Sequence, residues 1–246
     1  MVMNGSSIAF ILMALIAGFA GGFLLANKLN GSEIAALRAQ AAQQPTANTN
    51  QSRPNDDATL TVDELKAKIA EADRNPTNLT YQKRLGVSLY RYASMKQDSD
   101  LLAESIRILT RANSLDAKDF DVLVALGNAH FDVGFFKKDL ASFQTARNLY
   151  GKALDIKPGD ADVRTDLGIS YFVQEPPAYD KAIAELQRVL SAEPKLSRAL
   201  QFLVQVYTKQ GKLTEAEKSL ATLKEVSPNE PAIAELTSQI SAARNK

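Results

Sequence analysis

Residues 120–158 read FDVLVALGNAHFDVGFFKKDLASFQTARNLYGKALDIKP, and this stretch decides the fold. Its apolar residues recur three and four positions apart, as they do on one face of an α-helix. Pro158 closes the stretch, because proline cannot continue a helix. The segment between Val133 and Leu140 separates two such patterns. The stretch therefore predicts two consecutive helices.

The same stretch is repeated along the chain. Leu126-Gly127 has counterparts 41 residues away on either side, Leu85-Gly86 and Leu167-Gly168. The same step relates three aromatic residues, Tyr90, Phe131 and Phe172. The next step shortens to 36 residues. Such internal periodicity is typical of a helical solenoid, in which each unit covers the apolar face of its neighbour.

The unit resembles the tetratricopeptide repeat, whose first helix carries W-x2-L-G-x2-Y and whose second carries A-x3-F, a small residue and a late proline. In the second unit the matching residues are Leu123, Leu126, Gly127, His130, Ala146, Tyr150, Ala153 and Pro158. In the third they are Arg164, Leu167, Gly168, Tyr171, Ala182, Leu186, Val189 and Pro194. In the fourth they are Leu200, Leu203, Val204, Tyr207, Ala216, Leu220, Leu223 and Pro228. The first unit matches least well and has Ala117 where proline is usual.

The resemblance implies an all-α fold, a right-handed α-solenoid of tetratricopeptide helix pairs over residues 59–246. We expect units at about 79–119, 120–160, 161–196 and 197–230, followed by a capping helix at 231–244. The first two units are seven residues longer than the family's usual length. We expect that extra length to form longer turns between the helices, around Met95–Leu101 and Val133–Leu140.

The N-terminal part predicts a membrane anchor over residues 1–27. Ile8–Ala26 contains 19 residues without a charge and would span about 28 Å as a helix. A cleaved signal peptide is the alternative, although no Lys or Arg precedes the apolar run. Residues 28–58 include QPTANTNQSRPNDD and predict a mostly disordered linker, because this composition cannot bury a core. The whole chain thus predicts a single transmembrane helix, a flexible linker and the solenoid.

Small residues recur every four positions in the apolar run, at Ala14, Gly18, Gly22 and Ala26. This spacing allows two helix backbones to approach closely, so it predicts a homodimer through the transmembrane helix. The other interpretation is that glycine and alanine are simply common in membrane helices.

A protein or peptide partner is expected on the concave face, which in this family is lined mainly by the first helices. Projecting the family's geometry onto the chain places these side chains there: Lys83, Val87, Tyr90, Arg91, Asp121, Val124, Asn128, Phe131, Asp132, Asp162, Thr165, Ile169, Phe172, Arg198, Gln201, Gln205 and Lys209. Tyr90, Phe131 and Phe172 would form either an aromatic platform for a peptide or part of the core, packed against the longer loops.

Some members of the family clamp a C-terminal carboxylate with basic and amide side chains. Lys83 matches one such position, but Val87 and Ala125 replace asparagines, and Asp162 and Asp166 stand where basic residues are expected. Two acids would repel a carboxylate, so this mode is rejected. The face instead looks positive at one end and negative in the middle, which suits a partner of mixed charge.

No catalytic function, cofactor or metal is expected. The chain has no cysteine and one histidine, which excludes disulfides, thiolate sites and sites of several histidines. The net charge of +1 and the shortness of the basic pairs argue against nucleic acid as a partner. No P-loop, dinucleotide fingerprint or nucleophile elbow is present.

The expected function is a membrane-anchored protein–protein interaction scaffold. The alternative is an assembly factor similar to the membrane-linked repeat proteins of cytochrome c maturation. We expect a single-pass protein of the plasma (inner) membrane. Lys28 and Arg38 follow the anchor and no Lys or Arg precedes it, which favours a cytoplasmic domain by a margin of two charges.

Overall fold

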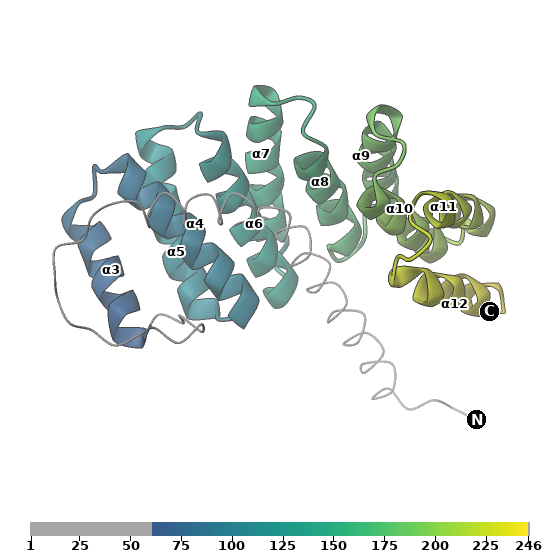
Figure 1. Ribbon diagram of the computed structural model, residues 1–246, viewed down its shortest axis with the longest axis horizontal. Helices are drawn as coiled ribbons and strands as arrows, with labels where there is room; N and C mark the ends of the chain where they lie inside the picture. Colours follow the sequence, from purple (N-terminus) through teal and green to yellow (C-terminus); the bar gives the residue numbers. More distant parts are fainter. Residues whose placement is uncertain (1–60, 246) are drawn as a thin grey trace, which may run out of the picture. The chain divides into compact units, whose positions relative to one another are not determined.

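The computed structural model describes residues 61–245, and within this range every regular element is an α-helix. Helix α3 (Val62–Arg74) comes first, and α12 (Ala232–Arg244) comes last. Between them lie four antiparallel pairs: α4 (Leu79–Lys96) with α5 (Ser99–Leu115), α6 (Phe120–Lys137) with α7 (Leu140–Ile156), α8 (Ala161–Val173) with α9 (Tyr179–Ala192), and α10 (Ser197–Gln210) with α11 (Leu213–Val226). The all-α fold of repeated helix pairs predicted from the sequence is confirmed (Figure 1).

The predicted anchor, its Ala14, Gly18, Gly22 and Ala26 face, and the linker lie outside the described residues. None of the helices in residues 61–245 combines the length and the apolarity needed to cross a bilayer.

The pairs are stacked in the order of the chain. Each first helix packs against its own second helix and against the first helix of the next pair, as α4 does with α5 and α6. Each second helix packs against the first helix that follows it, as α5 does with α6. Helix α12 covers α10 and α11 at the end of the stack. The apolar core therefore runs continuously through residues 79–240, and each pair contacts only its neighbours.

The repeated glycine of the first helix allows the two helices of a pair to approach closely. A Cβ added to Gly127 would lie 2.7 Å from Cε1 of Tyr150, which is buried in α7. A Cβ added to Gly86 would lie 2.8 Å from Leu109 of α5. Both distances are shorter than a van der Waals contact, so the close packing of the first two pairs requires glycine at these positions.

The turns inside the first two pairs differ from the prediction. Helices α4 and α6 each contain 18 residues, whereas α8 has 13 and α10 has 14, so the extra length extends the helices and leaves turns of two residues. Gln97 and Lys138 take the left-handed backbone conformation that ends each first helix. Asp98 and Asp139 then accept backbone N–H groups at the start of α5 and α7. The expectation of long loops was wrong because these two residues complete a tight turn without glycine.

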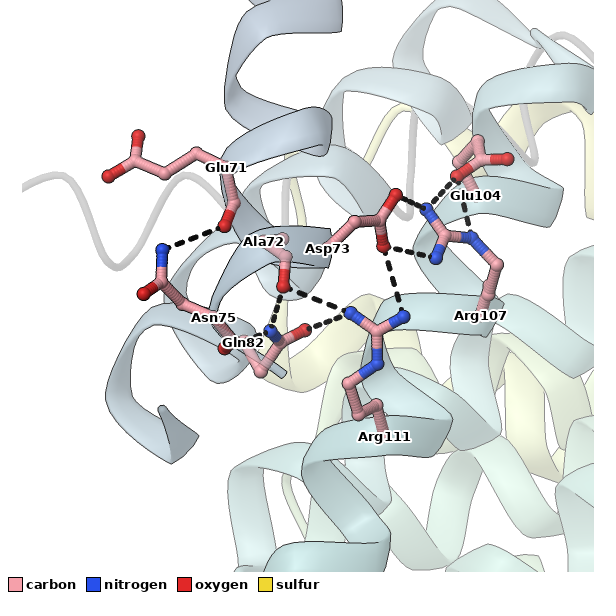
Figure 2. A network of polar contacts seen from close by, with 8 residues as sticks. All are labelled: Glu71, Ala72, Asp73, Asn75, Gln82, Glu104, Arg107 and Arg111. Atoms are coloured by element: carbon pink, nitrogen blue, oxygen red, sulfur yellow. Dashed lines mark hydrogen bonds and ion pairs between the residues drawn. The ribbon is translucent and has the colours of Figure 1, made fainter. Parts of the chain in front are cut away.

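A polar network holds the C-terminal end of α3 to the first pair (Figure 2). Figure 2 shows the Asp73 carboxylate between two arginines of α5, at 2.6 Å from Arg107 and 3.0 Å from Arg111. The buried Gln82 of α4 donates to the carbonyl oxygen of Ala72 at 2.7 Å. Because Arg111 donates to the same carbonyl, the last turn of α3 is bound by both helices of the pair.

Candidate partner-binding face

The four first helices, α4, α6, α8 and α10, lie next to one another through direct packing of each on the next. The side chains predicted to bind a partner all belong to these helices, and we call the surface that they form the first-helix face. Only a side chain that reaches solvent on this face is available to a partner. The burial of each residue therefore decides which predictions can stand.

Five of the predicted side chains are core residues and do not line an accessible surface. All five are buried within the helix stack, and they are Tyr90, Phe131, Asp132, Thr165 and Ile169. Their exposed fractions are all 8% or less. The projection from the family placed them on the surface, and the packing of helices within and between the pairs covers them.

The predicted aromatic platform is not formed by Tyr90 and Phe131. The Phe131 ring meets the Phe143 ring of α7 edge-on at 5.5 Å and stacks on Phe135 at 6.5 Å. The core alternative is therefore correct for these two residues, with helices rather than loops as their surroundings. Phe172 is half-buried and lies beside Tyr179 of α9, with 6.3 Å between the ring centres.

Lys83 is half-buried and already paired with two acids. Its Nζ lies 2.8 Å from an oxygen of Asp119 and 2.8 Å from an oxygen of Asp121. Burial opposes the charge of Lys83, but the hydrogen bonds that its ammonium donates to the two carboxylates raise its pKa above the ordinary value. The expected positive end of the face is thus neutralised at Lys83, which is a second reason why a partner's carboxylate would not bind there.

Buried polar side chains link the third pair to the fourth and also join the two helices of the second pair. Asp166 of α8 forms an ion pair with Arg198 of α10, and the Tyr150 hydroxyl donates to Asn128 Oδ1 at 2.8 Å. Burial raises the pKa of Asp166, and the guanidinium of Arg198 opposes that rise. The repeat pattern identified Arg198 and Asp166 separately and did not reveal their pairing. Opposite charges on adjacent first helices were the signal that could have revealed it.

Asp132 has no charged partner of opposite sign in this cluster. Its Oδ2 atom is buried without a hydrogen-bond partner. Burial raises the pKa of Asp132 to about 7, the nearby Ser94 and Tyr90 hydroxyls lower it in part, and the charge of Asp166 raises it further. This carboxyl therefore changes its protonation state close to neutral pH.

The remaining predicted residues keep some contact with solvent and run through all four pairs. Exposed side chains are Arg91, Asp121, Asp162 and Lys209. Half-buried side chains, besides Lys83, are Val87, Val124, Asn128, Phe172, Arg198, Gln201 and Gln205. The accessible part of the face mixes the apolar Val87 and Val124 with basic side chains of α4, is acidic at the start of α6 and α8, and is rich in amides on α10.

Residues 178–240, which include α9 to α11 and the first part of α12, match the family model described as tetratricopeptide repeat. This chain contains tetratricopeptide repeats. No curated protein sequence matches it. The family model thus covers the second helix of the third pair, the fourth pair and part of α12, and the solved structures extend the likeness in fold over the earlier pairs.

Three solved structures illustrate the likeness of the tetratricopeptide-repeat domain. The crystal structure of MamA protein is 23% identical, with a TM-score of 0.54, over 68% of this chain and 82% of that one. A tetratricopeptide repeat protein of Parabacteroides merdae is 20% identical, with a TM-score of 0.58, over 75% of this chain and 66% of that one. A thermophilic TPR protein of Thermus thermophilus is 17% identical, with a TM-score of 0.53, over 74% and 90%. At these identities the likeness shows a shared fold.

Proposed function

We propose that this protein is a membrane-anchored scaffold whose first-helix face binds an extended or helical segment of a partner protein. Tetratricopeptide repeats support a role in protein–protein interaction, and proteins built from them are typically without catalytic activity. The observation that carries the proposal is the strip of partly accessible side chains along α4, α6, α8 and α10. A strip that crosses every pair suits a ligand lying along the stack.

The chemistry of the strip describes the partner segment. Val87 and Val124 offer apolar surface to side chains of the partner, and Gln201 and Gln205 offer amides that both donate and accept. Asp162 is exposed, and Asp121 keeps 64% of its side chain exposed although it contacts Lys83. A segment with a basic side chain near these acids fits better than one with a carboxylate.

The test is site-specific photo-crosslinking in cells that express the full chain. A photoreactive amino acid at Gln201 should form crosslinks to a partner, because this side chain lies on the first-helix face. The matched control is Glu225, which is exposed on the second helix α11. Crosslinks of the same identity and strength from both positions would contradict the proposal. Asp162→Lys should weaken the Gln201 crosslink about tenfold, as expected for the loss of one charged contact and a new repulsion.

Membrane anchoring is the second part of the proposal and rests on the uncharged run Ile8–Ala26. We propose a single-pass protein of the plasma membrane with its repeats in the cytoplasm, as the charges of Lys28 and Arg38 favour. Alkaline phosphatase and a fluorescent protein fused after Lys246 test the orientation in a bacterial host. Phosphatase activity would reverse the orientation, and fluorescence without it would support the proposed one.

The assembly-factor alternative related to cytochrome c maturation rests on architecture alone and stays a prediction. Homodimerisation through Gly18 and Gly22 also stays a prediction. Gly18→Leu with Gly22→Leu should abolish association of the apolar segment in a membrane assay if these residues form the contact.

A further inference from the structure

The extended ends of the first two first helices display large apolar side chains. Met95 near the end of α4 is 50% exposed, and Phe136 near the end of α6 is 47% exposed. The two positions are 41 residues apart, so they are equivalent in the two units. Leu140 at the start of α7 is 41% exposed. Because α4 and α6 pack together and run in the same direction (Figure 1), their C-terminal ends and the start of α7 lie on one edge of the stack, which we call the apolar edge.

Internal packing does not account for the outer side chains of this edge. The extra turn of α6 uses its inner side, where Phe131 meets Phe143 and Gly134 allows that ring to approach. Phe136 lies on the outer side and meets Phe135 edge-on at 5.8 Å. The shorter third and fourth units have Gln174 and Gly211 where their first helices end. An extension needed only for packing would carry polar residues outward.

Three lysines border the apolar edge, Lys96, Lys137 and Lys138. Within residues 61–245 none of them forms an ion pair with an acid. The nearby Asp98 and Asp139 face the positive ends of α5 and α7 and accept their backbone N–H groups. The edge thus combines protruding Met, Phe and Leu side chains with three lysines that form no ion pair in the described part of the chain, although Asp98, Asp100 and Asp139 lie near them in the sequence.

We propose that the apolar edge contacts the headgroup region of an anionic bilayer. Met95, Phe136 and Leu140 enter the boundary between headgroups and acyl chains, while the three lysines meet lipid phosphates. A second copy of the chain is a poorer occupant, because the lysines of both copies would face one another. The contact goes beyond the proposed function, since it holds the repeat domain against the membrane in addition to any anchor.

The absence of cysteine makes the test direct. Phe136→Cys and Ile156→Cys each create one labelling site in the full chain. Ile156 is the matched control, because it is 40% exposed and lies at the other end of α7. Spin labels at the two sites are compared in vesicles of phosphatidylcholine with phosphatidylglycerol. We expect the Phe136→Cys label to be relaxed severalfold more by oxygen than by a water-soluble nickel chelate, and the Ile156→Cys label to show the reverse.

Equal access of the nickel chelate to both labels would overturn the proposal. So would a Phe136→Cys label shielded from both reagents without vesicles, since a protein surface would then cover the edge. Replacing Lys96, Lys137 and Lys138 by glutamine should remove most of the contrast between oxygen and nickel. An unchanged contrast would overturn the claim that the three lysines bind lipid phosphates. Flotation with vesicles reports anchoring separately: a chain that floats while its Phe136→Cys label stays in water keeps the anchor and loses this contact.

Discussion

Asp166 of α8 and Arg198 of α10 form an ion pair that joins the third and fourth helix pairs across the packing of their first helices. Both side chains are mostly buried, at 11% and 20% exposed. Removing one partner would leave the other charge without compensation in a site of low polarity.

Arg198→Met is therefore expected to lower the free energy of unfolding by about 3 kcal/mol. Urea unfolding followed by circular dichroism measures the change. Arg188→Met is the control, because that arginine pairs with Glu185 but keeps 66% of its side chain exposed. We expect the control to cost less than about 1 kcal/mol. Equal losses of unfolding free energy in the two variants would show that the buried ion pair with Asp166 contributes no more to stability than the exposed one.

Asp132 predicts a dependence of stability on pH. Its pKa is about 7 in the folded chain, because burial disfavours the charged form, and near 3.8 when it is unfolded. Between these values the folded state holds a proton that the unfolded state has lost, so stability falls as pH rises from about 4 to about 7. The full loss is at most about 4 kcal/mol and is present above pH 7.

Asp132→Asn should remove this slope and make the chain more stable than the parent above about pH 7. Urea unfolding at several pH values gives the slope directly. Asp155→Asn on the exposed side of α7 is the control and should leave the slope unchanged. A slope that survives in Asp132→Asn would assign the pH dependence to another group.

Gly127→Ala tests the close approach of α6 and α7. The new Cβ would lie 2.7 Å from Tyr150 Cε1, so the buried ring must move. We expect a loss of about 1–3 kcal/mol. Gly151→Ala is the matched control within α7, because nothing lies within 4 Å of its added Cβ. That variant should gain up to about 1 kcal/mol from helix propensity. Two variants of equal stability would contradict the packing described here.

Gln82→Leu tests the attachment of α3. The substitution removes the donors to the carbonyl oxygens of Ala72 and Asn75, at 2.7 Å and 2.9 Å. We expect a local cost of about 1–3 kcal/mol. Amide hydrogen exchange should accelerate in α3 and stay unchanged in α10 and α11. Exchange that accelerates evenly along the chain would indicate a global effect instead.

The fold was predictable to the extent that the repeated residues encode pairwise contacts. Leu126-Gly127 and Ala146 mark the positions at which α6 packs on α7, and equivalent residues recur at a nearly fixed step along the chain. The length of the first helices was not predictable in this way. Gln97 and Lys138 end α4 and α6 in the left-handed conformation without glycine, whereas Gly211 marks the end of α10 openly.

The candidate face was predictable only in part, because the repeat pattern does not specify how closely successive first helices approach. Tyr90 and Phe131 are buried, Phe131 against Phe143 of α7, so their positions in the repeat matched the family while their exposure did not. Val87, Gln201 and Gln205 keep partial exposure at the same kind of position. The repeat pattern also did not show that the charge of Lys83 is neutralised, because its partner Asp119 lies in the turn before the next unit.

The stacking of each helix pair on its neighbours alone has a mechanical consequence. Tension applied between Leu79 and Arg244 passes through the interfaces in series, so every interface carries the same force. Compliance is then additive, and the interface with the lowest resistance yields first while the others remain intact. We expect the Asp166–Arg198 pair to raise the resistance of the interface between the third and fourth pairs, so that the other interfaces extend first under load.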